Sequence, residues 1–129
     1  IWFAAMVDRD HDNPRATAIL SVNESFVVTD HVVVETWLLL NSRHGRKAAE
    51  YFWDGIRKGA AQVESVTPAD LAAGWRIGEL YEDQDFSIVD RTSFAVMERL
   101  GITRAASFDH HFAVYRYGPK RDRAFQIVR

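Results

Sequence analysis

Apolar positions along the chain alternate between helical spacing and short β-rich runs. We expect strands at FVVT (26–29), QVESV (62–66) and RAASF (104–108), and a strand end or extended lead-in at FSIVD (86–90). FQIV (125–128) is expected to be an edge strand that follows a turn at YGPKRDR (117–123). The segments between them have the spacing of helices, at 14–22, 31–40, 44–60, 67–83 and 91–100. Strands that alternate with helices predict a three-layer α/β/α fold with a mostly parallel sheet.

Helix boundary signals agree with these limits. Thr29 or Asp30 can cap the helix HVVVETWLLL, which is apolar almost all round and is expected to pack centrally. Thr67, followed by Pro68 at the first helical position and Asp70 at the third, is a strong helix start. Asp90 can cap the helix that Gly101 ends.

Length and composition limit the class of protein. With 129 residues, 47% of them hydrophobic, the chain is expected to form one domain over residues 1–129. The longest apolar run carries Glu35 at its centre, so we expect no membrane span. The absence of cysteine excludes thiolate chemistry and agrees with a reducing, cytoplasmic location.

Charge is unevenly distributed. Residues 62–98 hold 2 basic and 8 acidic side chains, whereas residues 99–129 hold 7 basic and 2 acidic ones. A cationic C-terminal third beside an acidic middle favours a polyanion that approaches a carboxylate cluster, although a solvated basic face explains the same pattern.

Two acids fall where ligands bind in α/β sheets. Asp90 and Asp109 each follow a short apolar segment and precede a helix, and such junctions at the carboxyl ends of strands carry ligand sites. A plain helix cap explains either acid taken alone. Glu35 lies among valines and leucines and needs a partner if it is buried. That partner is either an arginine such as Arg43 or Arg46, or solvent at the helix edge, or a hard divalent cation shared with the other two acids.

These residues resemble a known family. The order TDHVVVETWLLL, then IVDRTSFAVMERLGITRAASFDHHF, is similar to the PIN domain family in its VapC-type ribonuclease branch, over nearly the whole chain. Glu35, Asp90 and Asp109 match that family's metal-site acids, and Ser93 and His111 match its supporting hydroxyl and imidazole. We expect Ser93 to hydrogen-bond Asp90, His111 to pack near the site and His110 to lie exposed.

The resemblance implies a metal-dependent endoribonuclease. Mg²⁺ or Mn²⁺ would be held by the acids for hydrolysis of RNA phosphodiester bonds. It also implies the toxin of a toxin-antitoxin pair, with RNA as substrate, an antitoxin protein as inhibitor and a homodimer as assembly. The family's first strand and its Asp would precede Ile1, so the sequence predicts a PIN-like domain with a truncated first strand.

Other interpretations remain open. Charge alone suggests that RNA contacts Arg91, Arg116, Lys120, Arg121 and Arg123, whose simpler role is solvated surface. A noncatalytic PIN-like interaction module is the main alternative to an enzyme. A phosphate-accepting receiver domain ranks last, because no Lys follows the RAASF segment before Lys120. The D-H-H phosphoesterases need further motifs and a second domain, which this chain does not offer.

Overall fold

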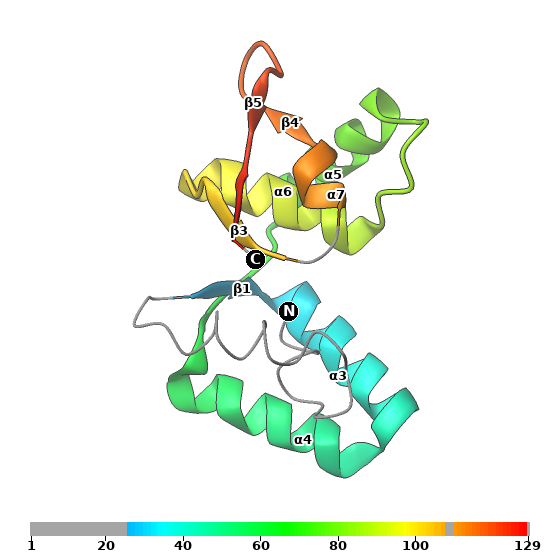
Figure 1. Cartoon of the computed structure of the whole chain (residues 1–129), viewed down its shortest axis with the longest axis vertical. Coiled ribbons are helices and arrows are strands. Elements are labelled where there is room, and N and C mark those ends of the chain that lie inside the picture. The colour runs from blue at the N-terminus through cyan, green and yellow to red at the C-terminus, as the bar shows by residue number, and fades with distance from the viewer. Residues whose placement is uncertain (1–25, 108–109, 129) are drawn as a thin grey trace. The chain divides into compact units, whose positions relative to one another are not determined.

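The computed structural model describes residues 26–107 and 110–128, which divide into two compact units, the first ending at Glu64 and the second covering 65–128. Figure 1 shows their helices and strands. Predictions about the helix at 14–22, and about Phe108 and Asp109, lie outside the described residues. Each unit is described separately below.

The first unit contains a parallel strand pair and two long helices. In chain order its elements are β1 (Val27–Thr29), α3 (Asp30–His44), α4 (Arg46–Gly55), the π-helix η1 (Ile56–Ala60) and β2 (Gln62–Glu64). β1 pairs with β2 in parallel. Strands were predicted at both places, and a mostly parallel sheet was expected. The Thr29 hydroxyl accepts a hydrogen bond from the Val32 amide at 3.1 Å, which confirms Thr29 as the cap of α3.

The prediction that α3 packs centrally is wrong for much of its surface. Leu40 is fully buried, but Val34 and Leu38 are 58% and 56% exposed. The hydrophobic core of this unit is formed instead by one stripe of α3 against the amphipathic α4, which lies beside it in Figure 1. Its buried members are Val28, Leu40, Ala49, Phe52, Ile56 and Ala61. An all-apolar helix therefore leaves apolar surface uncovered here, because only one stripe has neighbours to pack against.

The second unit begins with two helices that pack against each other, α5 (Pro68–Leu80) and α6 (Ile88–Leu100). Thr67 and Asp70 form the predicted capping box at the start of α5. The strand end predicted at 86–90 is not formed. Ser87 caps α6 instead, and Asp90 is its third residue rather than its cap. Gly101 ends α6 in the left-handed conformation at φ 69°, as predicted.

Short strands complete the second unit. β3 (Arg104–Ala106) pairs in parallel with β6 (Gln126–Val128), which confirms both predicted strands. Between them lie the single-turn helix α7 (His111–Val114) and an antiparallel hairpin of β4 (Arg116–Tyr117) and β5 (Arg123–Ala124). The sequence predicts only a turn at this place, and the two short strands were not expected.

Aromatic side chains fill the core of the second unit. Phe94 and Tyr115 are fully buried and stack with ring centroids 4.4 Å apart. Phe112 packs edge-on against Phe94, with ring centroids 5.0 Å apart, and so adds to this core. Because Phe94 belongs to α6, the packing of this core holds in place the helix that carries the candidate site. None of the helices in the described ranges is long and apolar enough to cross a membrane.

Candidate active site

Asp90 is positioned by the start of α6. Its Oδ2 accepts a hydrogen bond from the Ser87 backbone amide at 3.0 Å, while the Ser87 hydroxyl accepts one from the Asp90 amide at 3.1 Å. The two residues therefore cap the helix reciprocally, and the capping box holds the carboxylate beside the helix N-terminus.

His111 approaches the same carboxylate from a distant part of the sequence. Its Nδ1 lies 2.8 Å from Asp90 Oδ2, and both side chains are about 15% exposed. The His111 ring also packs edge-on against Phe86, with centroids 5.2 Å apart. The predicted position of His111 near the site is thus matched by a direct contact with Asp90, while His110 is exposed as expected.

Ser93 lies one helical turn after Asp90, on the same side of α6. The predicted hydrogen bond between them is not formed, because Ser93 Oγ is buried and has no hydrogen-bond partner among the described residues. A buried hydroxyl that lacks a partner costs about 1–3 kcal/mol, so it indicates a group that binds there. This hydroxyl and the Asp90 carboxylate provide oxygen donors on one face of the helix.

This donor set suits a hard divalent cation. Mg²⁺ and Mn²⁺ prefer carboxylate, hydroxyl and water oxygens, which Asp90 and Ser93 supply here. Within residues 26–107 and 110–128, no three His, Asp or Glu side chains gather closely enough to form a metal site by themselves.

The other two predicted acids are placed differently. Glu35 is on α3 in the first unit and is exposed. Of the three explanations for Glu35, its exposure agrees with a helix edge in contact with solvent. Arg46 is paired with Glu50 at 3.2 Å. Asp109 lies outside the described residues, and the convergence of all three acids stays a prediction.

At least three of the five arginines and lysines predicted to contact RNA have structural partners, and Arg121 is one of them through the Tyr115 hydroxyl. Arg116 Nη1 donates to the carbonyls of Ala113, Val114 and Tyr115 at 2.7–3.2 Å and so closes the end of α7. Arg91 Nε donates to the Phe86 carbonyl at 3.2 Å, and its side chain packs over Gly78 of α5. Lys120, Arg121 and Arg123 are exposed on the hairpin.

A second acid on α6, Glu98, was not among the predicted site residues. The Glu98 carboxylate accepts hydrogen bonds from the Tyr115 hydroxyl at 2.8 Å and from the Gly118 amide at 3.2 Å. Burial, reinforced by the bond to Glu98, raises the pKa of Tyr115 above its ordinary value. Tyr115 therefore remains a proton donor to Glu98. Both residues are ordinary in the sequence, and no motif distinguishes them.

Comparison with known proteins identifies the class. The sequence profile of the PIN domain matches residues 1–116. The chain belongs to the PIN domain family, in its VapC-type branch, and the predicted α/β fold of PIN type is confirmed.

Particular relatives come from Mycobacterium tuberculosis. The 23S rRNA-specific endonuclease VapC20, known from strains CDC 1551 and H37Rv, is 40% identical over 88 residues, or 67% of this chain and 66% of the relative. This chain thus spans slightly less than two thirds of those relatives. The crystal structure of VapC20, described as a toxin that cleaves the sarcin-ricin loop, has a TM-score of 0.79 at 33% identity. The match covers 84% of this chain and 85% of that one.

Proposed function

We propose that this protein is a metal-dependent endoribonuclease that hydrolyses RNA phosphodiester bonds as the toxin of a toxin-antitoxin pair. The observation that carries the proposal is the constrained Asp90 carboxylate, held by Ser87 and His111 beside the unpartnered Ser93 hydroxyl. Similarity to an rRNA endonuclease supports the same reaction class.

Glu35, Asp90 and Asp109 would hold one or two Mg²⁺ or Mn²⁺ ions. Such an ion lowers the pKa of water and offsets negative charge on the phosphate during in-line attack. Within the chain, the capping box fixes the direction of the Asp90 carboxylate, and His111 keeps one of its oxygens in place. No side chain has to act as the nucleophile.

The proposed partners follow from membership in the branch. We propose a cognate antitoxin protein as inhibitor and a homodimer as the assembly, within a single PIN-like domain. The exposed apolar side chains of α3, Val34 and Leu38, are compatible with a protein contact. A cytoplasmic location stays a prediction, as does the family's further Asp ahead of Ile1.

Cleavage of labelled RNA by the full-length protein, with Mg²⁺ or Mn²⁺ and with chelator, tests the proposal. We expect Asp109→Asn and Asp90→Asn to lower the cleavage rate by about a hundredfold or more, because each substitution removes a metal-binding charge. Asn at position 90 can still accept the Ser87 amide, so the helix start is retained. Asp83→Asn, at an exposed position in a turn, is the matched control and should cleave normally.

Folding of each variant is checked by circular dichroism. Undiminished cleavage by both acid variants would refute the proposed metal site. If the folded wild-type protein binds Mn²⁺ in calorimetry but cleaves no RNA, the endoribonuclease proposal fails. Absence of both binding and cleavage would favour the alternative, a noncatalytic PIN-like interaction module.

A further inference from the structure

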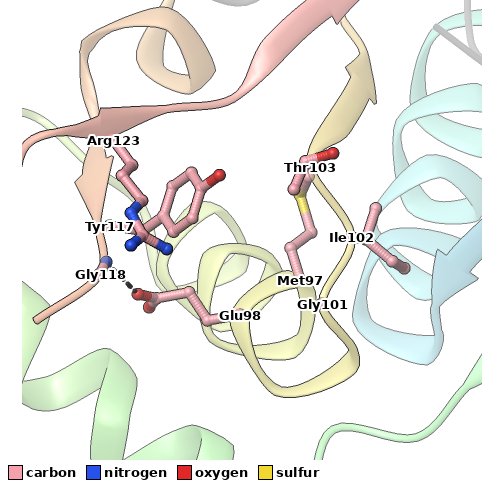
Figure 2. A pocket seen from close by; sticks show the side chains of 8 residues that line it. All are labelled: Met97, Glu98, Gly101, Ile102, Thr103, Tyr117, Gly118 and Arg123. Atoms are coloured by element: carbon pink, nitrogen blue, oxygen red, sulfur yellow. Dashed lines mark hydrogen bonds between the residues drawn. The ribbon is translucent and has the colours of Figure 1, made fainter.

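A cavity of about 330 Å³ lies in the second unit, at the end of α6 away from Asp90. Figure 2 shows its lining. Met97 and Ile102 supply apolar surface, Tyr117 an aromatic ring, and Glu98 and Arg123 opposite charges, together with Gly101, Thr103 and Gly118. A pocket with apolar walls and a few convergent polar groups is typical of a small-ligand site, and this volume lies at the lower end of the usual range.

The Glu98 carboxylate is a fixed acceptor at this cavity. Each of its oxygens already accepts one hydrogen bond, Oε2 from the Tyr115 hydroxyl and Oε1 from the Gly118 amide, which holds the group in one orientation. Figure 2 shows the bond from Gly118. A carboxylate offers about four acceptor positions, so two remain. Both carboxylate oxygens can therefore accept from two neighbouring N–H groups of a ligand.

Arg123 contributes donors to the same cavity. Its side chain runs across Gly118, where an added Cβ would lie 3.3 Å from Arg123 Cδ, and Gly118 has φ 92°. Glu98 and Arg123, which carry opposite charges, both line the cavity. The cavity thus presents fixed acceptors and a donor fork together.

The Tyr117 ring completes this arrangement. It stacks on Phe125, with centroids 4.9 Å apart and planes within 15°, and is held rigidly in the aromatic core. Unpaired RNA bases are recognised by packing on aromatic or guanidinium planes and by hydrogen bonds along their edges. The three side chains Glu98, Tyr117 and Arg123 provide each of these elements.

We infer that this cavity binds an unpaired guanine base of the RNA substrate. Guanine carries two adjacent donors, N1–H and N2–H₂, which match the two free acceptor positions of Glu98. It also carries the acceptors O6 and N7, the pair that arginine binds in protein–nucleic acid complexes. Adenine offers no adjacent donor pair, and a pyrimidine fills less of the space. The cavity would therefore contribute base specificity.

This inference rests on the proposed ribonuclease function, and the geometry of α6 connects the two sites. Asp90 and Glu98 are eight residues apart on one helix, which is about 12 Å along its axis. An RNA strand that reaches Asp90 can thus place a base from a nearby nucleotide in the cavity. The acid near one helix end would act on the phosphodiester, and the cavity near the other would select the base.

Binding of mononucleotides to the full-length protein tests this directly. We expect guanosine monophosphate to shift the Gly118 amide resonance in NMR titrations, with an affinity at least about tenfold above that of adenosine or cytidine monophosphate. Glu98→Gln should remove this preference, because it replaces one acceptor with a donor. Arg123 is exposed, and its replacement leaves the hydrogen bond from Tyr115 to Glu98 intact. Arg123→Ala should therefore weaken the binding of guanosine monophosphate more than that of the other nucleotides.

Lys120→Ala is the matched control, since it removes one positive charge from the same hairpin without altering the cavity lining. This variant should weaken the binding of all mononucleotides equally, because Lys120 would contact only their phosphate. Equal shifts with every nucleotide, absence of any shift, or an unchanged guanine preference in both Glu98→Gln and Arg123→Ala would overturn the inference. RNA cleavage that depends on Asp109 but lacks guanine preference would leave the proposed function standing and remove only the cavity's role. Guanine-selective binding without RNA cleavage would support the role of the cavity and contradict the proposed ribonuclease function.

Discussion

At the scale of single residues, Asp90 combines its structural role at the helix start with the metal-binding role that we propose for it. Its Oδ2 accepts from the Ser87 amide and contacts His111 Nδ1, while Ser93 Oγ remains unsatisfied nearby. Groups that orient a metal-binding carboxylate typically change metal affinity or activity by 10–100-fold when they are removed. His111 is therefore expected to act as a positioning residue for Asp90.

We expect His111→Ala to lower both Mn²⁺ affinity and the RNA cleavage rate by about 10–100-fold. His111→Asn should recover part of this loss, because its amide can donate to the same carboxylate oxygen. Mn²⁺ calorimetry and cleavage kinetics, compared with His110→Ala, make the measurement. If His111→Ala changed only the melting temperature and not Mn²⁺ affinity, its role would be structural alone.

The sequence predicted some of these residues and not others, for physical reasons. Asp90 and His111 are conspicuous because a charged or polar side chain interrupts apolar segments. Their direct contact was not predictable, because it joins positions 21 residues apart through the packing of α7 on α6. Glu98 and Tyr115 gave no signal, since a polar residue near a helix end and an aromatic residue in a core are both common.

At the scale of elements, local signals were reliable where capping and propensity agreed. Thr67, Pro68 and Asp70 predicted the start of α5 correctly. Ser87 and Asp90 form the same kind of box, but the β-branched pair Ile88 and Val89 between them favoured a strand in the sequence analysis. In the structure, the capping box outweighs this weak β-propensity, so the helix begins at Ile88, two residues before Asp90.

The pairing of Asp70 with Arg99 ties the start of α5 to the end of α6. Asp70 is 3% exposed, and its two oxygens accept from Arg99 Nε at 3.1 Å and Nη2 at 3.0 Å. Burial alone would raise the pKa of Asp70, but the hydrogen bonds from Arg99 and Thr67 outweigh it and lower the pKa overall. The charged form is thus favoured in the folded protein.

Asp70→Ala should reduce the free energy of unfolding at pH 7 by about 2–4 kcal/mol, because it removes both a helix cap and a largely buried ion pair. Since the folded pKa is the lower one, this stabilisation is complete above the unfolded pKa of about 3.9 and is lost as pH falls through the folded value. Urea denaturation of both proteins should therefore show a gap that narrows below about pH 4. Asp83→Ala, in an exposed turn, is the control, and a gap independent of pH would contradict this assignment.

At the scale of the whole molecule, the sequence predicted the α/β class from its alternating pattern but not the arrangement of its short strands. The β4–β5 hairpin contains Gly118 and Pro119 and was interpreted only as a turn, because its strands are two residues long. Such brief pairings depend on neighbours distant in sequence, here the aromatic core around Phe125. The cationic C-terminal third is nevertheless partly explained by this hairpin, which exposes Lys120, Arg121 and Arg123.

Exposed cations on a hairpin attract RNA phosphates through counterion release, which makes the affinity depend on salt. We expect Lys120→Ala combined with Arg121→Ala, in an Asp109→Asn background that prevents cleavage, to weaken RNA binding at low salt. The slope of log affinity against log salt should fall by about 1.4, because single-stranded RNA releases about 0.7 counterions per neutralised phosphate. Fluorescence anisotropy between about 50 and 200 mM salt measures this slope. Arg57→Ala with Lys58→Ala is the charge-matched control, because both cations already pair with Asp54. If both double variants gave the wild-type slope, the hairpin would contact no phosphate, and Lys120 and Arg121 would be solvated surface.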